Sequence, residues 1–218
     1  MDDIYATVEE DFYDKSLRSP NPFTRHYHRQ RYARIRGWVG ELYQPGMQVL
    51  DVGCGSCEWN TAKLPAWGLD KSEKLLERGR KTGHLAHPIN ADFEQRLPFE
   101  DGKFGIVVLG EVLEHLENPD AKLREIWRVL APGGRLILTV PYDRFPSLWS
   151  ILFPLQCAYM GTVRNDPYYK AACGHINHFT PSSLRELLHT CGFEDERMET
   201  WLTMNIAAMA RKPESAEG

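Results

Sequence analysis

Residues 49–55 read Val-Leu-Asp-Val-Gly-Cys-Gly, an apolar run with one acid that is followed at once by two glycines. The run has the composition of a buried strand, and Gly53 and Gly55 allow a sharp turn and a close approach of a ligand to the main chain. In parallel sheets such turns lie at the carboxyl ends of the strands, where nucleotides bind. The stretch therefore predicts a strand that leads directly into a ligand-binding loop.

Short apolar runs alternate with amphipathic charged stretches from residue 48 onward, which predicts strands alternating with helices. We expect strands at 48–52, 66–69, 88–90, 104–110 and 135–140, helices at 27–43, 72–82, 118–130 and 182–191, and a closing hairpin at 193–201 and 204–210. Asn118 and Thr180, each followed by proline, are expected to cap their helices. The Ala-Pro-Gly-Gly stretch after Leu130 is expected to form a turn. The predicted fold class is α/β, a doubly wound, mostly parallel sheet with a C-terminal antiparallel hairpin.

The chain shows no internal repeat and no linker, so we expect one domain over residues 1–218. Within it the sequence suggests an N-terminal helical cap (1–45), a cofactor-binding core (46–140), a substrate lid or insert (141–179), and a C-terminal helix with the hairpin (180–211). The insert is rich in aromatics and prolines without a clear period. Irregular segments of that length in a compact domain are usually lids or binding elements.

Charge, cysteine content and the N-terminal sequence limit which partners and which compartment suit the chain. Lys and Arg number 26 and Asp and Glu number 30, which gives a net charge of −4 at pH 7 in 218 residues. Nucleic acid is disfavoured as a partner, because duplex-binding proteins usually carry a basic excess, and only the stretch from Arg25 to Arg36 is locally basic. The acidic N-terminus lacks a secretory signal and the five cysteines fit a reducing compartment, which favours the cytoplasm. No apolar run predicts stable membrane insertion.

A second acid strengthens the case for a bound nucleoside. Asp70 ends the second predicted strand about 20 residues after the first, where an acid can accept hydrogen bonds from a ribose diol. Glu58 stands where a dinucleotide fingerprint has its third glycine, and a carboxylate there would oppose a pyrophosphate. The pattern favours a cofactor without phosphate over a nicotinamide dinucleotide, and a nicotinamide-dependent oxidoreductase is the second hypothesis.

Six motifs in order resemble the class I S-adenosylmethionine-dependent methyltransferases, and more closely their small-molecule branch that includes the quinone-biosynthesis methyltransferases. The resemblance covers residues 49–193 and rests on VLDVGCG, GLDKS, NADF, LPFEDGKFGIVVLGEVLEHL, LAPGGRLILTVP and HINHFTPSSLRELLHTCGF. It implies a Rossmann-like methyltransferase fold of seven strands, S-adenosyl-L-methionine as the cofactor and a small-molecule acceptor. The alternative is a non-catalytic S-adenosylmethionine-binding protein that acts as a regulator or partner subunit.

The resemblance also implies which residues hold the cofactor. The two glycines would pass beneath its methionine and ribose parts, with one acid near the amino group and another on the ribose. An acid and a phenylalanine would hold the adenine, and two residues would border the cofactor at the end of the fourth strand. In that order along the chain, the expected set is Asp51, Gly53, Cys54, Gly55, Asp70, Lys71, Asp92, Phe93, Glu111 and Val112.

The chain departs from the pattern of that family at three places. Cys57 stands where the family usually has a glycine, and Gly105 stands where an aspartate is common. The helix expected at 56–64 is shorter than that of the family, because Pro65 ends it.

Methyl transfer depends mostly on holding nucleophile, methyl and sulfur in line in a dry pocket. We expect transfer to oxygen, for which a base helps, and histidine is the natural candidate. His115 and His178 are the expected catalytic residues, with a structural role in the loop as the alternative for His115.

Two metal sites can be drawn from the sequence, although the expected metal set is none. Glu111, Glu114 and His115 resemble a divalent-metal constellation of some quinone O-methyltransferases, and oxygen-rich ligands suit magnesium. A zinc site could be sketched from histidines and cysteines, namely His175, His178, Cys54, Cys57 and Cys173. A disulfide between the first two of these cysteines under oxidation is a further open alternative.

The apolar stretch at 145–160 is expected to form a wall over an apolar or aromatic acceptor. Two alternatives remain open: its residues cap the hydrophobic core, or the stretch lies on a membrane surface, against which the scarcity of nearby basic residues counts. Tyr27 is expected to close the site from the N-terminal helix, and His28 to lie on a solvated face.

Overall fold

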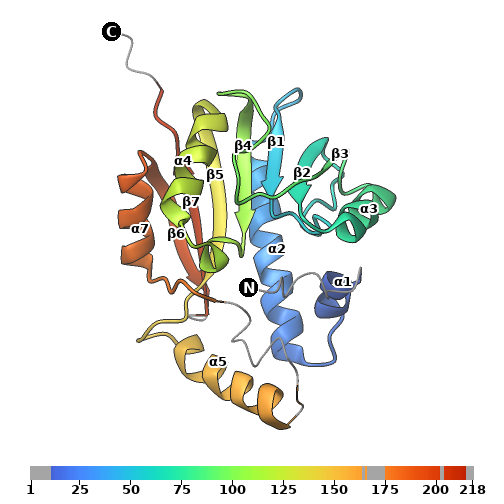
Figure 1. Cartoon of the computed structure of the whole chain (residues 1–218), viewed down its shortest axis with the longest axis vertical. Coiled ribbons are helices and arrows are strands. Elements are labelled where there is room, and N and C mark those ends of the chain that lie inside the picture. Colours follow the sequence, from blue (N-terminus) through green and yellow to red (C-terminus); the bar gives the residue numbers. More distant parts are fainter. Residues whose placement is uncertain (1–10, 164, 166–174, 202–203, 215–218) are drawn as a thin grey trace.

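The structure is a computed structural model, and it describes residues 11–163, 165, 175–201 and 204–214. Seven strands form one sheet in the order β3-β2-β1-β4-β5-β7-β6 (Figure 1). The first five pair in parallel, whereas β7 runs antiparallel to both β5 and β6. The predicted fold class, a mostly parallel seven-stranded sheet with a C-terminal antiparallel hairpin, is confirmed.

The strands lie close to their predicted positions. They are β1 Val49–Val52, β2 Ala66–Asp70, β3 His87–Asn90, β4 Phe104–Gly110, β5 Leu130–Pro141, β6 Glu194–Trp201 and β7 Asn205–Arg211. The largest difference is at β5, which already begins at Leu130. The Ala-Pro-Gly-Gly stretch that was expected to form a turn is the irregular start of this strand, with Gly133 at φ +71° and a shift of the β4–β5 register. Such an irregularity uses glycine to bend a strand without ending it.

The helices are α1 Phe12–Leu17, α2 Pro22–Leu42, α3 Glu73–Thr82, α4 Pro119–Val129, α5 Trp149–Ala158 and α7 Pro181–Thr190, with a 3₁₀ turn η2 at Leu113–His115 and a π turn η3 at Tyr159–Val163. The prediction of a helix at 56–64 is wrong, because this segment forms successive turns. The buried side chain of Asn60 fixes them: its amide nitrogen donates to the carbonyls of Leu64 and His84 at 2.9 and 2.8 Å, and its oxygen accepts from the Leu64 N–H.

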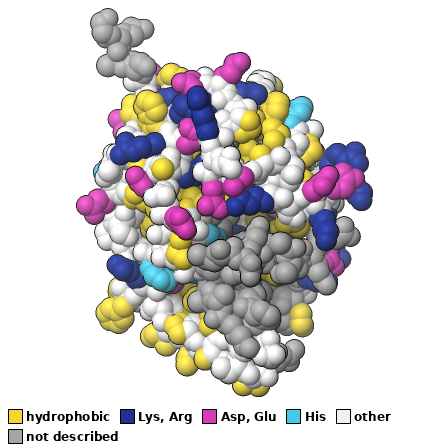
Figure 2. Space-filling view, viewed as in Figure 1, with side chains coloured by type: hydrophobic (Ala, Val, Ile, Leu, Met, Phe, Trp, Pro, Cys, Tyr) yellow, Lys and Arg dark blue, Asp and Glu magenta, His cyan; other side chains and the backbone are white. Residues whose placement is uncertain are grey.

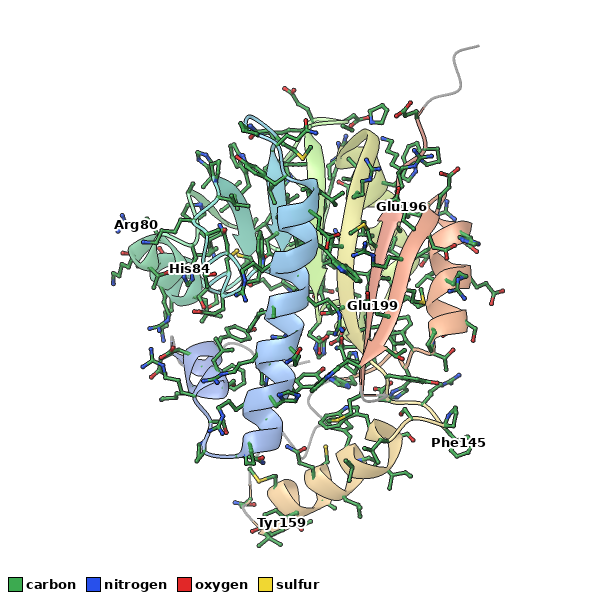
Figure 3. The ribbon with its side chains drawn as sticks, turned by 180° about the vertical axis from the view of Figure 1, so that it is seen from behind. Arg80, His84, Phe145, Tyr159, Glu196 and Glu199 are labelled. Atoms are coloured by element: carbon green, nitrogen blue, oxygen red, sulfur yellow. The ribbon has the colours of Figure 1, made fainter. Side chains whose placement is uncertain are left out.

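The helices cover both faces of the sheet (Figures 1 and 3). On one face α2 packs Ile35, Trp38 and Val39 against residues of β4, β5 and β7, and on the other α4 and α7 contribute to a second apolar cluster. The order of strands reverses between β1 and β4, and the crevice at such a switch point is where doubly wound sheets bind ligands. Both α1 and α5 lie beyond this edge (Figure 1).

The insert after β5 contains a helix that the sequence did not reveal. Its α5 is apolar on both faces, so the helical period is invisible in the sequence. Among the described residues, no helix is both long and apolar enough to cross a membrane.

The two predicted helix caps differ in the structure. Thr180 forms a capping box: its hydroxyl accepts from the Ser183 N–H at 3.1 Å, and the Ser183 hydroxyl accepts from the Thr180 N–H at 2.9 Å. Asn118 occupies the N-cap position of α4, but its side chain makes no capping hydrogen bond. The prediction that Asn118 is the N-cap, with Pro119 at the first helical position, is therefore confirmed, although the cap has no side-chain hydrogen bond.

The capping box yields a stability prediction. Thr180→Ala removes the acceptor of a helix-end N–H and should lower the free energy of unfolding by about 1 kcal/mol, measured by urea denaturation. Thr180→Ser keeps the hydroxyl and should stay within about 0.5 kcal/mol of the parent protein. Equal losses in the two variants would show that the hydroxyl does not stabilise this helix.

Candidate active site

The loop after β1 is drawn tightly around two glycines. Gly53 and Gly55 have φ values of +68° and +51°, a region that favours glycine. A Cβ atom at Gly53 would lie 2.7 Å from the Val112 side chain, and one at Gly55 would lie 2.5 Å from the ring of Tyr13 in α1. The loop therefore leaves no room for side chains at these positions, because Val112 and Tyr13 pack directly against its two glycines.

Cys57 shows why the related family prefers glycine at this point. Its φ is +55°, and its N–H donates to the Cys54 carbonyl at 2.8 Å, which closes a tight turn. The turn is thus kept although a side chain replaces the usual glycine. Cys54 and Cys57 are free thiols here, and burial raises the pKa of both, which disfavours their reactive thiolate forms.

Asp70 connects this loop to the start of α3. One carboxylate oxygen accepts from the Gly55 N–H at 2.7 Å and the other from the Ser72 N–H at 2.8 Å. The side chain is buried. Because each carboxylate oxygen can accept more than one hydrogen bond, Asp70 keeps capacity for ligand hydroxyls.

Asp51 is a second buried carboxylate at the same edge. Its Oδ2 accepts from the indole N–H of Trp59 at 2.8 Å, a partner that sequence reasoning missed. Burial raises the pKa of Asp51 to about 7, although hydrogen bonds from Trp59 and Cys57 oppose this rise. A cationic group placed against Asp51 would favour its charged form.

Residues after β2 and β3 complete this side of the site. Lys71 Nζ lies 3.1 Å from Asp92 Oδ1 and 2.7 Å from Glu94 Oε1, and it sits 5.3 Å from the centre of the Phe93 ring. Burial raises the pKa of Asp92, but hydrogen bonds from the Glu94 N–H and Lys71 outweigh it and hold the pKa below normal. The Phe93 ring also approaches Gly53. The structure thus brings the predicted ribose and adenine residues to one edge.

Glu111 follows β4 with a φ of +58° and is held by three donors. The Tyr27 hydroxyl donates at 2.7 Å, the Asn205 amide at 2.9 Å, and the Arg31 guanidinium lies at 3.5 Å. Burial and the charge of Glu111 raise the pKa of Tyr27 far above its ordinary value, so that the hydroxyl remains a donor. This Glu111 network joins α2, β4 and β7. Its member Asn205 had no signal in the sequence.

Both predicted catalytic histidines lie in a cluster around Asp143. His178 Nδ1 and His175 Nδ1 lie 2.9 and 3.3 Å from the same Asp143 oxygen, and the rings of His115 and His175 meet edge to face at 5.1 Å. Burial raises the pKa of Asp143, yet the hydrogen bonds of the two histidines outweigh it and keep the pKa low. Sequence reasoning missed Asp143, which lies outside every motif that carried the resemblance.

Glu114 borders this cluster from below the surface. Its carboxylate is 1% exposed and has no hydrogen-bond partner among the residues that the structure describes, and burial, followed by the charge of Glu111, raises its pKa well above normal. One ligand atom each from Glu114, His115 and His175 lie within 4.8 Å of one another, a spacing that could hold a divalent cation. Glu111, which the sequence grouped with Glu114 and His115, is held in the separate Glu111 network. Of the sketched zinc ligands, Cys173 lies outside the described residues.

Four rings form a stacked column along the insert. Tyr27 stacks on Trp149 at 5.7 Å, Trp149 on Phe153 at 5.3 Å, and Phe153 on His175 at 5.1 Å. The column runs from α2 through α5 to the histidine cluster. His28 beside it is not on a solvated face as expected: it is half-buried, and burial lowers its pKa to about 3.

Comparison with known proteins identifies the family. Residues 50–138 match the family described as "Methyltransferase domain". A demethylmenaquinone methyltransferase of Staphylococcus epidermidis is 30% identical over 185 residues, which cover 76% of this chain and 75% of the relative. One from Symbiobacterium thermophilum is 30% identical over 192 residues, with 76% and 75% covered.

A solved S-adenosylmethionine-dependent methyltransferase of Methanosarcina mazei shares the fold, with a TM-score of 0.59, 20% identity, and coverage of 82% of this chain and 98% of that one. The glycine cradle and the two buried carboxylates suit a nucleoside cofactor that carries an ammonium group and no phosphate. The chain belongs to the class I S-adenosylmethionine-dependent methyltransferases and resembles their quinone methyltransferases.

Proposed function

We propose that this methyltransferase methylates a small, apolar or aromatic acceptor at oxygen. The observation that carries the proposal is the aromatic column that ends at the Asp143 histidine cluster. Stacked rings provide a flat apolar wall for an aromatic acceptor, and an imidazole beside it can accept a hydroxyl proton. The relatives are named for demethylmenaquinone, which supports a quinone-like or phenolic ring.

The cofactor side of the site is proposed to work through the carboxylates and glycines. S-Adenosylmethionine supplies an activated methyl group on sulfur. Asp70 accepts hydrogen bonds from the ribose hydroxyls while it retains the two backbone donors that it already holds. Asp51 faces the amino group, and Phe93 with Asp92 holds the adenine. These contacts orient the methyl group toward the acceptor side, which is the main source of rate in such a displacement.

The proton is proposed to leave through the histidines. As the acceptor oxygen bonds to the methyl carbon and the carbon–sulfur bond breaks, the hydroxyl proton passes to His115, which is half-buried next to His175. His178 is 47% exposed and hydrogen-bonded to Asp143, which places a second imidazole where it can exchange protons with water. The low pKa of Asp143 keeps a negative charge that stabilises protonated imidazole.

Asp70 provides the first test. Asp70→Ala should weaken the binding of S-adenosylhomocysteine by about 1.5 to 3 kcal/mol, because charged acceptors are lost, as measured by calorimetric titration. Glu100→Ala, which removes an exposed carboxylate elsewhere, is the control and should bind normally. Thermal unfolding of both variants checks that the loop remains folded. Unchanged affinity in a folded Asp70→Ala variant would overturn the ribose assignment.

The pKa of Asp51 predicts how binding depends on pH. The free carboxylate titrates at about pH 7, and the ammonium of the bound cofactor favours its charged form, so binding must release a proton below that pH. Affinity for S-adenosylhomocysteine should therefore rise with pH, by up to about tenfold per unit below pH 7, and level off above it. Asp51→Asn should abolish this slope. The same slope in that variant would assign the titration to another group.

Labelled-methyl transfer to a panel of phenols and quinols tests the reaction itself. His115→Gln should lower kcat by about 100-fold because the base is lost, while the affinity for S-adenosylhomocysteine stays unchanged. His189→Gln, an exposed histidine of α7, is the matched control. Product methylated only at carbon or nitrogen would contradict the assignment of oxygen.

A further inference from the structure

The outer face of α5 is apolar and exposed. Its side chains recur at the three- and four-residue spacing that places them on one side of a helix. Together with the residues just before and after the helix they form an outer stripe, which consists of Phe145, Leu148, Ile151, Leu152, Leu155, Tyr159 and Val163, exposed by 39 to 83%. Figure 3 shows Phe145 and Tyr159 pointing away from the body of the molecule. Contiguous exposed apolar patches on soluble proteins usually mark an interaction site.

The inner face of the same helix is already used by the site. Trp149 and Phe153 stack within the aromatic column, and Phe153 is buried. The outer stripe is therefore not part of the hydrophobic core. The helix α5 thus carries the proposed acceptor wall on its inner face and the outer stripe on its exposed face.

The described charges at the stripe's end of the molecule are mostly basic, and the acids at α1, Asp11 and Asp14, pair with Lys15 and Arg18. Residues 145–163 contain no charged side chain, and the exposed Arg144 directly precedes them. The segment from Lys15 to Gly40 contains seven Lys and Arg residues and no acid, and its exposed Arg29 lies in the half of α2 at the same end of the molecule as α5 (Figure 1). Where described residues form the lower end in Figure 2, their atoms are apolar or uncharged, and charged side chains of both signs lie higher up.

We propose that the outer stripe lies flat on an anionic lipid surface, with Arg144 and Arg29 near the headgroups. Interfacial helices are held by buried apolar side chains together with basic residues that face anionic headgroups. Bases are scarce in the sequence around α5, but the fold brings the basic first half of α2 to the same end of the molecule as the stripe (Figure 1). A second copy of the chain fits less well, because a two-fold contact through the stripe would bring like-charged arginines of both copies to one interface. An acceptor dissolved in lipid would then reach the aromatic column past α5, a step that rests on the proposed function.

Sedimentation with vesicles tests the proposal. The full chain should bind vesicles of phosphatidylcholine with 30% phosphatidylglycerol, bind pure phosphatidylcholine more weakly, and bind less as salt is raised. Ile151→Glu/Leu155→Glu should lower the partition coefficient at least tenfold. Ala62→Glu/Ala86→Glu adds the same charge at exposed sites remote from the stripe and should bind almost normally.

A second pair of variants tests the basic border. Arg144→Gln should weaken binding to the anionic vesicles about fivefold, whereas Arg96→Gln, an exposed arginine beside the cofactor edge, should leave it unchanged. All substituted side chains are exposed, so each variant should fold. Calorimetry with S-adenosylhomocysteine on the same preparations checks this.

Two results would overturn the lipid surface. The first is the absence of vesicle binding by a chain that binds S-adenosylhomocysteine, which would leave the cofactor assignment intact. The second is a dimer in analytical ultracentrifugation that Ile151→Glu/Leu155→Glu dissociates, because the stripe would then be an interface between copies. Loss of S-adenosylhomocysteine binding in the parent protein, with vesicle binding retained, would count against the proposed function alone.

Discussion

The cofactor side of the molecule depends on the two hydrogen bonds that the Asp70 carboxylate accepts. They join the end of β2 to the start of α3 and to the glycine loop, whose Gly53 and Cys54 N–H groups also donate to the Leu69 carbonyl of β2. Both donors are backbone N–H groups at a buried edge, where an unpaired N–H is costly. The ribose acceptor proposed for the cofactor is thus the same group that shapes the loop beneath it, so recognition adds to contacts that exist before binding.

The side of the site proposed for the acceptor depends on a different set of contacts. The Glu111 network and the aromatic column share Tyr27, whose hydroxyl donates to Glu111 while its ring begins the column. A shift of α2 would therefore disturb a polar network and a stack of rings together. A methyltransferase of this fold can thus keep a common cofactor pocket while the wall proposed to select the acceptor varies.

The sheet was predictable because its central parallel strands β1, β2 and β4 are mostly buried and appear in the sequence as apolar runs. The residues proposed to hold the cofactor followed from motifs next to them. The helix α5 was not, since apolar side chains on both of its faces hide the period. The turns at 56–64 depend on one asparagine that bonds to a distant carbonyl. Asp143, Trp59 and Asn205 reach the site through contacts that carry no local pattern, and only the folded chain brings them there.

The Glu111 network has a consequence for the order in which the protein folds. Its donors stand at positions 27, 31 and 205 and its acceptor at 111, so the network spans most of the chain. While the chain is being synthesised, the sheet up to β5 can form and Tyr27 can donate to Glu111, but the donor to the other carboxylate oxygen, Asn205, arrives only with β7. β7, the last strand in the described part of the chain, thus completes the arrangement beside the proposed acceptor wall, and a chain halted before β7 would present the cofactor loop without the complete Glu111 network.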